Sequence, residues 1–445
     1  MLRRLWRGWR GGPAADAQSA FGRAVTYFDN RQFDMVVALL EPLAERSPPH
    51  PEALNMLGLV IAREQGRFRE AAVLVRRAVE VRPSFREARV NLGWILAESG
   101  EPDEGIACLD ILIEEDPADH EARLMRATAQ LKLARFEAGW SDYESRHHSV
   151  TATPCPYDFP IWDGRPNPQK TLLVVAEQGI GDQIMFASCL GSLRPAVGKL
   201  LIECHPYLVP LLQRAFPQDK VGSRVPGCAV PEWAGGERID AQLPIGSLPR
   251  FFRNASGDFP RHGAYLSADP VRVAYWRARL RALGPGGKVG LSWRGGTATS
   301  RRSLRSLAPE MIEPLFAAGG YFINLQYGST EAELLAFARL KVKGASFIHW
   351  PDALESYEET AALVVALDLV ISVCTAVIHL AGALGQQVWI LVPSAPEWRY
   401  LASGEGLPWY PSARLFRQKE PFEWDEVLER VARELDAHLS FSVRK

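Results

Sequence analysis

Hydrophobic and polar residues are arranged in two different ways along this chain. In the first third, apolar residues recur at helical spacing, in pairs of amphipathic stretches separated by turns. From Thr171 onward, helical stretches alternate with short apolar runs of β type: TLLVVA, KLLIECH, KVGLSW, YFINLQ, DLVISV and QQVWILV. A final amphipathic helix is predicted over EWDEVLERVARELDAHL, with one apolar face formed by Val427, Leu428, Val431, Leu435 and Leu439. The pattern predicts an all-helical region followed by parallel sheets covered on both faces by helices.

The helical region repeats with a period of about 34 residues. Pro48, Pro83 and Pro117 fall 35 and 34 positions apart, and EALNMLG returns as EARVNLG. Two amphipathic helices per unit, small residues at close-packing positions and a proline after the second helix form the tetratricopeptide signature. We expect three repeats, over 17–50, 51–84 and 85–118, and a fourth unit from residue 119. Such a stack offers a groove to an extended peptide or partner helix, or serves only as a dimerisation surface or rigid arm; both alternatives stay open.

The region after the repeats divides into two α/β blocks, at about 171–265 and 287–425. The bridge between them, GAYLSADPVRVAYWRARLRALGPGG, is predicted as strand, helix and loop. We therefore expect five segments: a basic tail (1–16), the repeats (17–148), a proline-rich linker (149–170) and two Rossmann-like domains (171–284 and 285–445). Two such domains facing each other place a ligand site at the carboxyl ends of their strands.

Composition indicates which partners and which cellular compartment to expect. With 51 basic and 52 acidic residues, the chain has no overall attraction for nucleic acid, and any anion site must be a local cluster. The six cysteines include no C-x-x-C pair, which argues against a zinc ribbon or disulfide framework and fits a reducing compartment. Without a secretory segment or an apolar run of about 20 residues, a cytoplasmic location is expected. Residues 1–10 also fit a weak peripheral contact with the inner membrane, although we favour a frayed basic tail.

The best anion-binding candidate is the segment SVCTAVIHLAGALG. A strand ends at Val373, and a helix is predicted from Cys374 and Thr375. The backbone N–H groups of Thr375, Ala376 and Val377 would point out of the helix N-terminus, where the dipole favours an anion. Thr375 can cap that end or donate to a phosphate oxygen. His379 lies on the same face one turn later. The alternative is an ordinary strand–helix–strand core unit with a satisfied histidine.

Polar residues after other strands are predicted to lie around the same site. The loop after GLSW carries Arg294, Arg301, Arg302 and Arg305, whose guanidinium groups suit phosphate or carboxylate; by itself it would be read as a solvated basic loop. Gln326 ends a strand and is expected to bind a base or sugar edge. Glu397, Trp398 and Arg399 follow another strand and are expected at the rim of the pocket.

The turn AEQGIGDQ, between a strand and a helix, carries an acidic residue where a phosphate would be repelled. Gly179 and Gly181, after Gln178, would permit a sharp turn and close approach of a substrate. Asp182 can take a proton from an incoming hydroxyl, which is the work of a general base. Asp182 also suits the N-cap of a helix starting at Gln183, and the two roles are compatible.

These segments together resemble the heptosyltransferase-like glycosyltransferases of the GT-B fold, in the bacterial branch that carries tetratricopeptide repeats. EQGIGDQIMFA matches the family's E-Q-G-x-G-D turn, and SVCTAVIHLAGALGQQVW matches its S-V-D-T-A-x-x-H-L-A-G-A-L-G-x-x-V-W signature. The shorter matches WDGRP, GLSW, LRSL, NLQYG and WYPSARLFRQ occur in the expected order. The resemblance implies α-helical tetratricopeptide repeats followed by a GT-B unit of two Rossmann-like α/β domains.

The resemblance also implies roles for individual residues. Asp182 stands where the family has its catalytic base, and Thr375, Ala376 and His379 stand where it binds the nucleotide-sugar diphosphate. Cys374 replaces the aspartate that the family usually has there, and TSRRSLRS departs from its N-D-x-x-R-S form. Either the donor differs from ADP-heptose, or donor binding is weakened, or catalysis has been lost.

We therefore expect an inverting glycosyltransferase that uses a nucleotide-sugar co-substrate and neither a metal ion nor another cofactor. The acceptor hydroxyl is expected on a protein recruited by the repeats, such as a flagellar or surface subunit, or on a surface glycan. The competing hypothesis is a non-catalytic interaction scaffold with a degenerate transferase fold. A dinucleotide-dependent oxidoreductase is disfavoured, because GIGD is not G-x-G-x-x-G. The sugar, nucleotide, acceptor and oligomeric state are not specified by the sequence.

Overall fold

The computed structural model describes residues 15–148, 155–224, 231–261, 263–296, 301–340 and 342–442. The chain forms two compact units: the first comprises Met1–Pro154 and Ala395–Ala402, and the second comprises Cys155–Ser394 and Ser403–Lys445. The membrane contact expected of residues 1–10 lies outside the described residues. None of the helices within the described ranges has the length and apolar content needed to cross a membrane.

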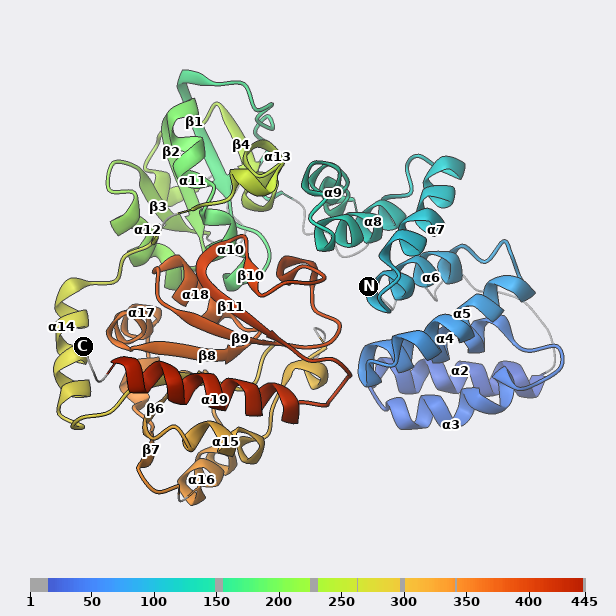
Figure 1. Ribbon diagram of the computed structural model, residues 1–445. Helices are drawn as coiled ribbons and strands as arrows, with labels where there is room; N and C mark the ends of the chain where they lie inside the picture. Colours follow the sequence, from blue (N-terminus) through green and yellow to red (C-terminus); the bar gives the residue numbers. More distant parts are fainter. Residues whose placement is uncertain are drawn as a thin grey trace. The chain divides into compact units, whose positions relative to one another are not determined.

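The first unit is built from pairs of antiparallel helices, coloured blue to teal in Figure 1. The pairs are α2 (Ala15–Asp29) with α3 (Phe33–Ala44), α4 (Pro51–Gln65) with α5 (Phe68–Val81), α6 (Arg86–Glu98) with α7 (Pro102–Glu115), and α8 (His120–Lys132) with α9 (Phe136–Tyr143). Each predicted repeat corresponds to one pair, although α2 starts two residues before the first predicted repeat, and α8 with α9 forms the fourth, so the tetratricopeptide prediction is confirmed.

Glycines allow the two helices of a pair to pack closely. A Cβ atom on Gly58 would lie 2.5 Å from Cγ2 of Val75, and one on Gly93 would lie 2.6 Å from Cγ of Leu109. A Cβ on Gly105 would lie 2.4 Å from the carbonyl oxygen of Gly93. Real Cβ atoms do not come so close, and therefore a larger residue at any of these positions would force the helices apart.

A segment distant in sequence completes the first unit. The short 3₁₀ turn Trp398–Tyr400 contacts α9, where the ring of Trp398 lies 5.4 Å from Trp140 and 5.7 Å from Tyr143. The backbone N–H of Ala402 donates to the carbonyl oxygen of Lys132 at 2.8 Å. The expectation that Trp398 lies at the rim of a ligand pocket is wrong, because its ring is buried among aromatic side chains of the repeats.

The second unit contains two parallel sheets, each with its own helices. The sheet of the first α/β half has the strand order β3-β2-β1-β4. These strands are β1 (Asn167–Val175), β2 (Val197–Cys204), β3 (Lys220–Ser223) and β4 (Ala241–Pro244), accompanied by the helices α10 (Ile180–Ala187), α11 (Leu190–Leu193), α12 (Val209–Ala215) and α13 (Pro249–Phe252). The strand β1 starts within the stretch expected to be linker.

The sheet of the second α/β half has the order β10-β11-β9-β8-β5-β6-β7, in which only the short β10 is antiparallel to its neighbour. Its strands are β5 (Lys288–Ser292), β6 (Gly320–Asn324), β7 (Ala345–Ile348), β8 (Leu369–Val373), β9 (Val388–Val392), β10 (Gly406–Leu407) and β11 (Tyr410–Arg417). Its helices are α15 (Glu313–Phe316), α16 (Glu331–Arg339), α17 (Tyr357–Ala366), α18 (Ala376–Ala383) and α19 (Asp425–Ser442). The predicted alternation of strands and helices is therefore confirmed in both halves.

Of two further predictions for the second unit, the final helix is confirmed and the strand in the bridge is wrong. The helix α19 runs along the sheet (Figure 1), and all five of its predicted apolar residues are buried in the core that the sheet forms. In contrast, residues 263–267 form no strand; the N–H groups of Tyr265 and Leu266 instead donate to the carbonyl oxygen of Ala383, each at 3.0 Å. The bridge between the halves is therefore a loop followed by helix α14 (Pro270–Arg281).

Candidate functional site

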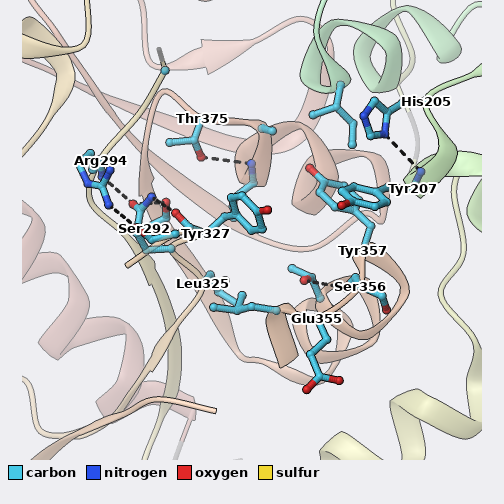
Figure 2. Close-up of a pocket in the computed structure, with 18 residues that line it drawn as sticks. His205, Tyr207, Ser292, Arg294, Leu325, Tyr327, Glu355, Ser356, Tyr357 and Thr375 are labelled. Carbon is cyan, nitrogen blue, oxygen red and sulfur yellow. Dashed lines mark hydrogen bonds between the residues drawn. The ribbon is translucent and has the colours of Figure 1, made fainter. Parts of the chain in front are cut away.

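A cavity of about 740 Å³ opens at the carboxyl ends of strands in the second unit (Figure 2). Both α/β halves contribute to its wall. Among the described residues it is lined by Ile180, His205, Tyr207, Ser292, Arg294, Gly296, Leu325, Gln326, Tyr327, Gly328, Leu354, Glu355, Ser356, Tyr357, Thr360, Thr375, Ala376 and Val377. The volume is that of a ligand pocket for a molecule of nucleotide size.

The topology of the second half explains why the cavity lies there. Chain order runs from β5 through β6 to β7 on one side, and β8 pairs with β5 on the other side. This reversal leaves a crevice beyond the carboxyl ends of β5 and β8. Ser292 ends β5 and Thr375 follows β8, so both line the cavity at the switch point.

The N-terminus of helix α18 faces the cavity. Thr375 is its N-cap, and its hydroxyl oxygen accepts the N–H of Val377 at 3.1 Å. Ala376 and Val377, in the first turn, also line the cavity. A Cβ on Gly295 would lie 2.6 Å from the carbonyl oxygen of Cys374, so glycine is needed for the loop after β5 to pass here. The positive end of the α18 dipole is therefore available to an anion.

The turn that carries Asp182 packs against the same helix. A Cβ on Gly181 would lie 3.0 Å from Cδ2 of His379 and 3.4 Å from Cα of Ala376. Asp182 is half-buried in the first turn of α10, and its carboxylate accepts the N–H of Gly179 at 3.3 Å. The structure thus packs the turn that carries Asp182 against the N-terminus of α18; Ile180 of this turn is among the described residues that line the cavity, whereas Asp182 is not.

Details of this turn differ from the sequence-based expectation. Helix α10 starts at Ile180, not Gln183, so Asp182 caps the helix from within its first turn. The left-handed residue is Gln178, with a φ of 60°, whereas Gly179 has a φ of −83° that other residues adopt readily. Gly181 is needed for close approach, but to helix α18 rather than to a substrate.

Arg294 lines the cavity, but its charge already has a partner. Its guanidinium donates to both carboxylate oxygens of Glu333, at 2.7 and 3.0 Å, and to the carbonyl oxygen of Gly328 at 2.7 Å. Burial alone would raise the pKa of Glu333, but hydrogen bonds from Arg294, Thr330 and Trp293 outweigh it and hold that pKa at about 2. The pair is therefore ionised at neutral pH, and Arg294 offers a ligand less net charge than the sequence suggests.

Gln326 also lines the cavity, with most of its hydrogen-bonding capacity used by the protein. Its amide oxygen accepts the hydroxyl of Ser292 at 3.1 Å and the backbone N–H groups of Trp293 and Arg294 at 3.1 and 2.8 Å. Its amide nitrogen donates to the carbonyl oxygen of Tyr327 at 3.0 Å. Gln326 therefore ties the end of β6 to the end of β5 and shapes the wall.

Three other expected donor-binding residues are not among the described residues that line the cavity. The thiol of Cys374 is buried and points to the carbonyl oxygen of Leu391, 3.8 Å away. Nδ1 of His379 lies 2.9 Å from the hydroxyl oxygen of Tyr410, deep against β11. Arg305 is buried at the end of the 3₁₀ turn Ser303–Arg305. The departure from the family pattern at Cys374 therefore affects the support of the α18 turn rather than the cavity surface.

Sequence reasoning missed the aromatic part of the wall. Tyr327 and Tyr357 come from the second half, and His205 and Tyr207 from the first (Figure 2). The rings of Tyr207 and Tyr357 stack across the two halves, with centroids 6.4 Å apart and planes at 16°. His205 directly follows β2, and Tyr327 follows β6 at a short distance, so position at a strand end was the available signal.

The chemistry of the cavity is that of hydroxyl, amide and aromatic groups. Among the described side chains, no three His, Cys, Asp or Glu residues are grouped to hold a metal ion. Ser292, Ser356 and Thr375 present hydroxyls, and the α18 N-terminus presents backbone N–H groups. Tyrosine rings suit flat or sugar rings, while the polar groups suit phosphate and hydroxyl oxygens.

The fold defines a class of protein: tetratricopeptide repeats joined to two α/β halves, each with a largely parallel sheet. Residues 62–131 match the tetratricopeptide repeat family. Over 424 residues, covering 90% of this chain and 70% of the relative, the sequence is 32% identical to Protein FlbA of Caulobacter vibrioides. The chain belongs to the FlbA family.

Solved structures share parts of this architecture. ADP-heptose LPS heptosyltransferase II of E. coli matches with a TM-score of 0.42 and 14% identity, over 62% of this chain and 99% of that chain. A mutant O-GlcNAc transferase of Thermobaculum terrenum matches with a TM-score of 0.33 and 16% identity, over 98% of this chain and 94% of that chain. Similarity at this level does not establish a shared activity.

Proposed function

We propose that this protein is a glycosyltransferase that moves a sugar from a nucleotide-sugar donor to an acceptor hydroxyl, with inversion and without a metal ion. One observation carries the proposal: the Asp182 turn of the first half packs directly on the N-terminus of α18, which opens into the cavity. This packing supports a reaction in which the Asp182 carboxylate acts on a substrate whose anionic part lies at the α18 N-terminus. Displacement of a diphosphate by a hydroxyl needs both groups.

In the proposed reaction, the donor diphosphate lies against the α18 N-terminus. The backbone N–H groups there and the hydroxyl of Thr375 stabilise the negative charge that develops on the leaving oxygen. Arg294 contributes a partly neutralised charge, since Glu333 holds its guanidinium. The tyrosine-lined part of the cavity suits the nucleobase, because bases stack on aromatic rings.

Asp182 acts as the general base in this scheme. The acceptor oxygen bonds to the anomeric carbon while its proton passes to the Asp182 carboxylate, and the bond from that carbon to the diphosphate oxygen breaks. A single displacement of this kind inverts the anomeric configuration. The acceptor is a protein brought by the tetratricopeptide repeats, which in general bind extended segments or helices.

A non-catalytic scaffold remains the second candidate. Two observations favour it: Arg294 and Gln326, both expected to bind the donor, are engaged by protein groups, and a buried thiol stands at Cys374. The two candidates differ in whether the cavity binds a nucleotide. Calorimetry with UDP, GDP, ADP, CMP and dTDP is the first measurement, and failure of all five to bind the folded protein would favour the scaffold.

Asp182→Asn tests the transferase directly. Asparagine keeps an oxygen that can cap Gly179 but cannot take a proton, so hydrolysis of the bound nucleotide sugar with water as acceptor should fall by about 10²- to 10⁴-fold. Asp258→Asn is the matched control, because the Asp258 carboxylate also caps a turn, accepting the N–H of Ala255 at 2.8 Å. Unchanged turnover in a folded Asp182→Asn protein would rule out Asp182 as the base.

A further inference from the structure

His205 is tied to the helix that carries Asp182. It is the first residue after β2, and it lines the cavity from the first half (Figure 2). Its backbone N–H donates to the side-chain oxygen of Gln183 at 2.7 Å. Gln183 is the neighbour of Asp182, so the backbone of His205 is fixed relative to the start of α10.

The hydrogen bonds of His205 also determine where its ring proton lies. Nδ1 accepts the backbone N–H of Tyr207 at 3.3 Å, as the dashed line in Figure 2 shows. A nitrogen that accepts a hydrogen bond carries a lone pair, so the proton of the neutral ring is on Nε2. The ring packs edge-on against Tyr207, with centroids 4.9 Å apart. His205 is therefore an oriented donor through Nε2–H.

The ring of Tyr207 helps to hold this arrangement on the cavity wall. Tyr207 and His205 belong to one short turn, which begins the 3₁₀ helix Pro206–Leu208. The ring of Tyr207 stacks on Tyr357 of the second half, and near it Arg214 forms an ion pair with Glu358 at 3.0 Å. These contacts join the turn to the opposite wall.

We propose that His205 is a ligand-binding residue, whose Nε2–H donates a hydrogen bond to an oxygen of the molecule that fills the cavity. The oxygen belongs to the transferred sugar or to the phosphate beside it, because His205 is tied to the helix of the general base. This inference rests on the proposed function. His205 donates this hydrogen bond and stabilises charge on the oxygen, and Asp182 remains the base.

Two substitutions separate ligand binding from support of the turn. In His205→Asn, the side-chain oxygen can still accept the N–H of Tyr207, but no donor reaches the position of Nε2. In His205→Gln, the longer side chain carries an N–H group to about that position. We expect His205→Asn to weaken binding about tenfold, as for one lost hydrogen bond to a charged or polar oxygen, and His205→Gln to restore much of it.

The probes distinguish the two sources of the oxygen. Calorimetry is performed with the nucleotide that binds wild type, out of UDP, GDP, ADP, CMP and dTDP, and with its glucose conjugate. Weaker binding of both by His205→Asn places the oxygen on a phosphate, and weaker binding of the conjugate alone places it on the sugar. Equal binding of both compounds by wild type and His205→Asn overturns the inference and leaves the proposed function standing.

The tautomer is measured without any ligand. Histidine labelled with ¹⁵N, with the signals of residue 205 assigned by their loss in His205→Asn, should show a protonated Nε2 and an unprotonated Nδ1 in the free protein. A protonated Nδ1 would overturn the inference even if nucleotides bind. Binding of no nucleotide by wild type would overturn the proposed function, and with it the ligand role of His205.

Discussion

The two walls of the cavity are built in different ways. In the second half, Gln326 and Arg294 are held by several hydrogen bonds each, and Gln326 is only 6% exposed. In the first half, the wall consists of Ile180 and the short turn with His205 and Tyr207, where Tyr207 is 51% exposed. We therefore distinguish a preformed wall, whose side chains are held by many hydrogen bonds, from a wall that we call adaptable because the ring of Tyr207 is half-exposed.

The largest expected effect is on the preformed wall. Glu333→Ala removes the acceptor of the Arg294 guanidinium and of the Trp293 indole N–H, leaving a half-buried charge without its partner. We expect the free energy of unfolding of the second unit to fall by about 4 kcal/mol. Urea denaturation, followed by hydrogen exchange of β5 and β6, measures it.

Glu355→Ala is the control for this change. Glu355 lies on the same wall but is exposed, and its removal should change stability by no more than about 0.5 kcal/mol. Similar losses in the two variants would contradict the view that the Arg294–Glu333 pair holds this wall together.

Lowering the pH should destabilise the preformed wall, because it protonates the carboxylate of Glu333. The pKa of Glu333 is lowered from 4.5 to about 2 in the folded protein, so its stabilising contribution is complete above pH 4.5. That contribution, about 3 kcal/mol, is lost as the pH falls from about 4.5 to about 2. The stability difference between wild type and Glu333→Gln should shrink over this range; a difference independent of pH would refute the assignment.

We expect Gln326→Leu to lower the free energy of unfolding by about 2 kcal/mol. The hydroxyl of Ser292 and the N–H groups of Trp293 and Arg294 would lose their acceptor in a buried place. Gln387→Leu is the matched control, since Gln387 is an exposed glutamine of the same half. Thermal unfolding compares the two variants. Equal midpoint temperatures would show that Gln326 does not stabilise the contact between the ends of β5 and β6.

The smallest effect is expected on the adaptable wall. Tyr207→Ala removes an exposed ring that stacks on Tyr357, while the backbone N–H that binds His205 stays. We expect a loss of stability of about 0.5 kcal/mol. Hydrogen exchange of residues 205–209 tests it, and a loss above about 2 kcal/mol would mean that both walls are equally preformed.

Sequence patterns predicted the architecture well, because periodicity determines which faces are buried. The 34-residue period located each helix pair, and the glycines at Gly58 and Gly93 are where the close packing occurs. The strand runs were found because buried parallel strands are almost continuously apolar. The contact of Trp398 with α9 was not predicted, because its partners are distant in sequence and belong to no periodic pattern that includes it.

The site was predicted in part, and the predictions that were wrong share one physical cause. The cap at Thr375 and the turn at Asp182 follow from local patterns, and the structure brings them together. A sequence does not show which neighbours occupy a side chain, so the engagement of Arg294 by Glu333 was not foreseen. The place of His205 in the site could have been predicted from the sequence, because it is a polar residue directly after an apolar strand run.

The segment Ala395–Ala402 has a consequence for how the protein is made and how it evolves. Trp140 and Trp398 are 258 positions apart, yet both belong to the first unit. During synthesis, the ribosome releases α9 long before its partner ring exists, so the last repeat becomes complete only near the end of translation. A recombination event that exchanged only the N-terminal repeats would separate Trp398 from its partners, because the repeats and the segment Ala395–Ala402 form one compact unit.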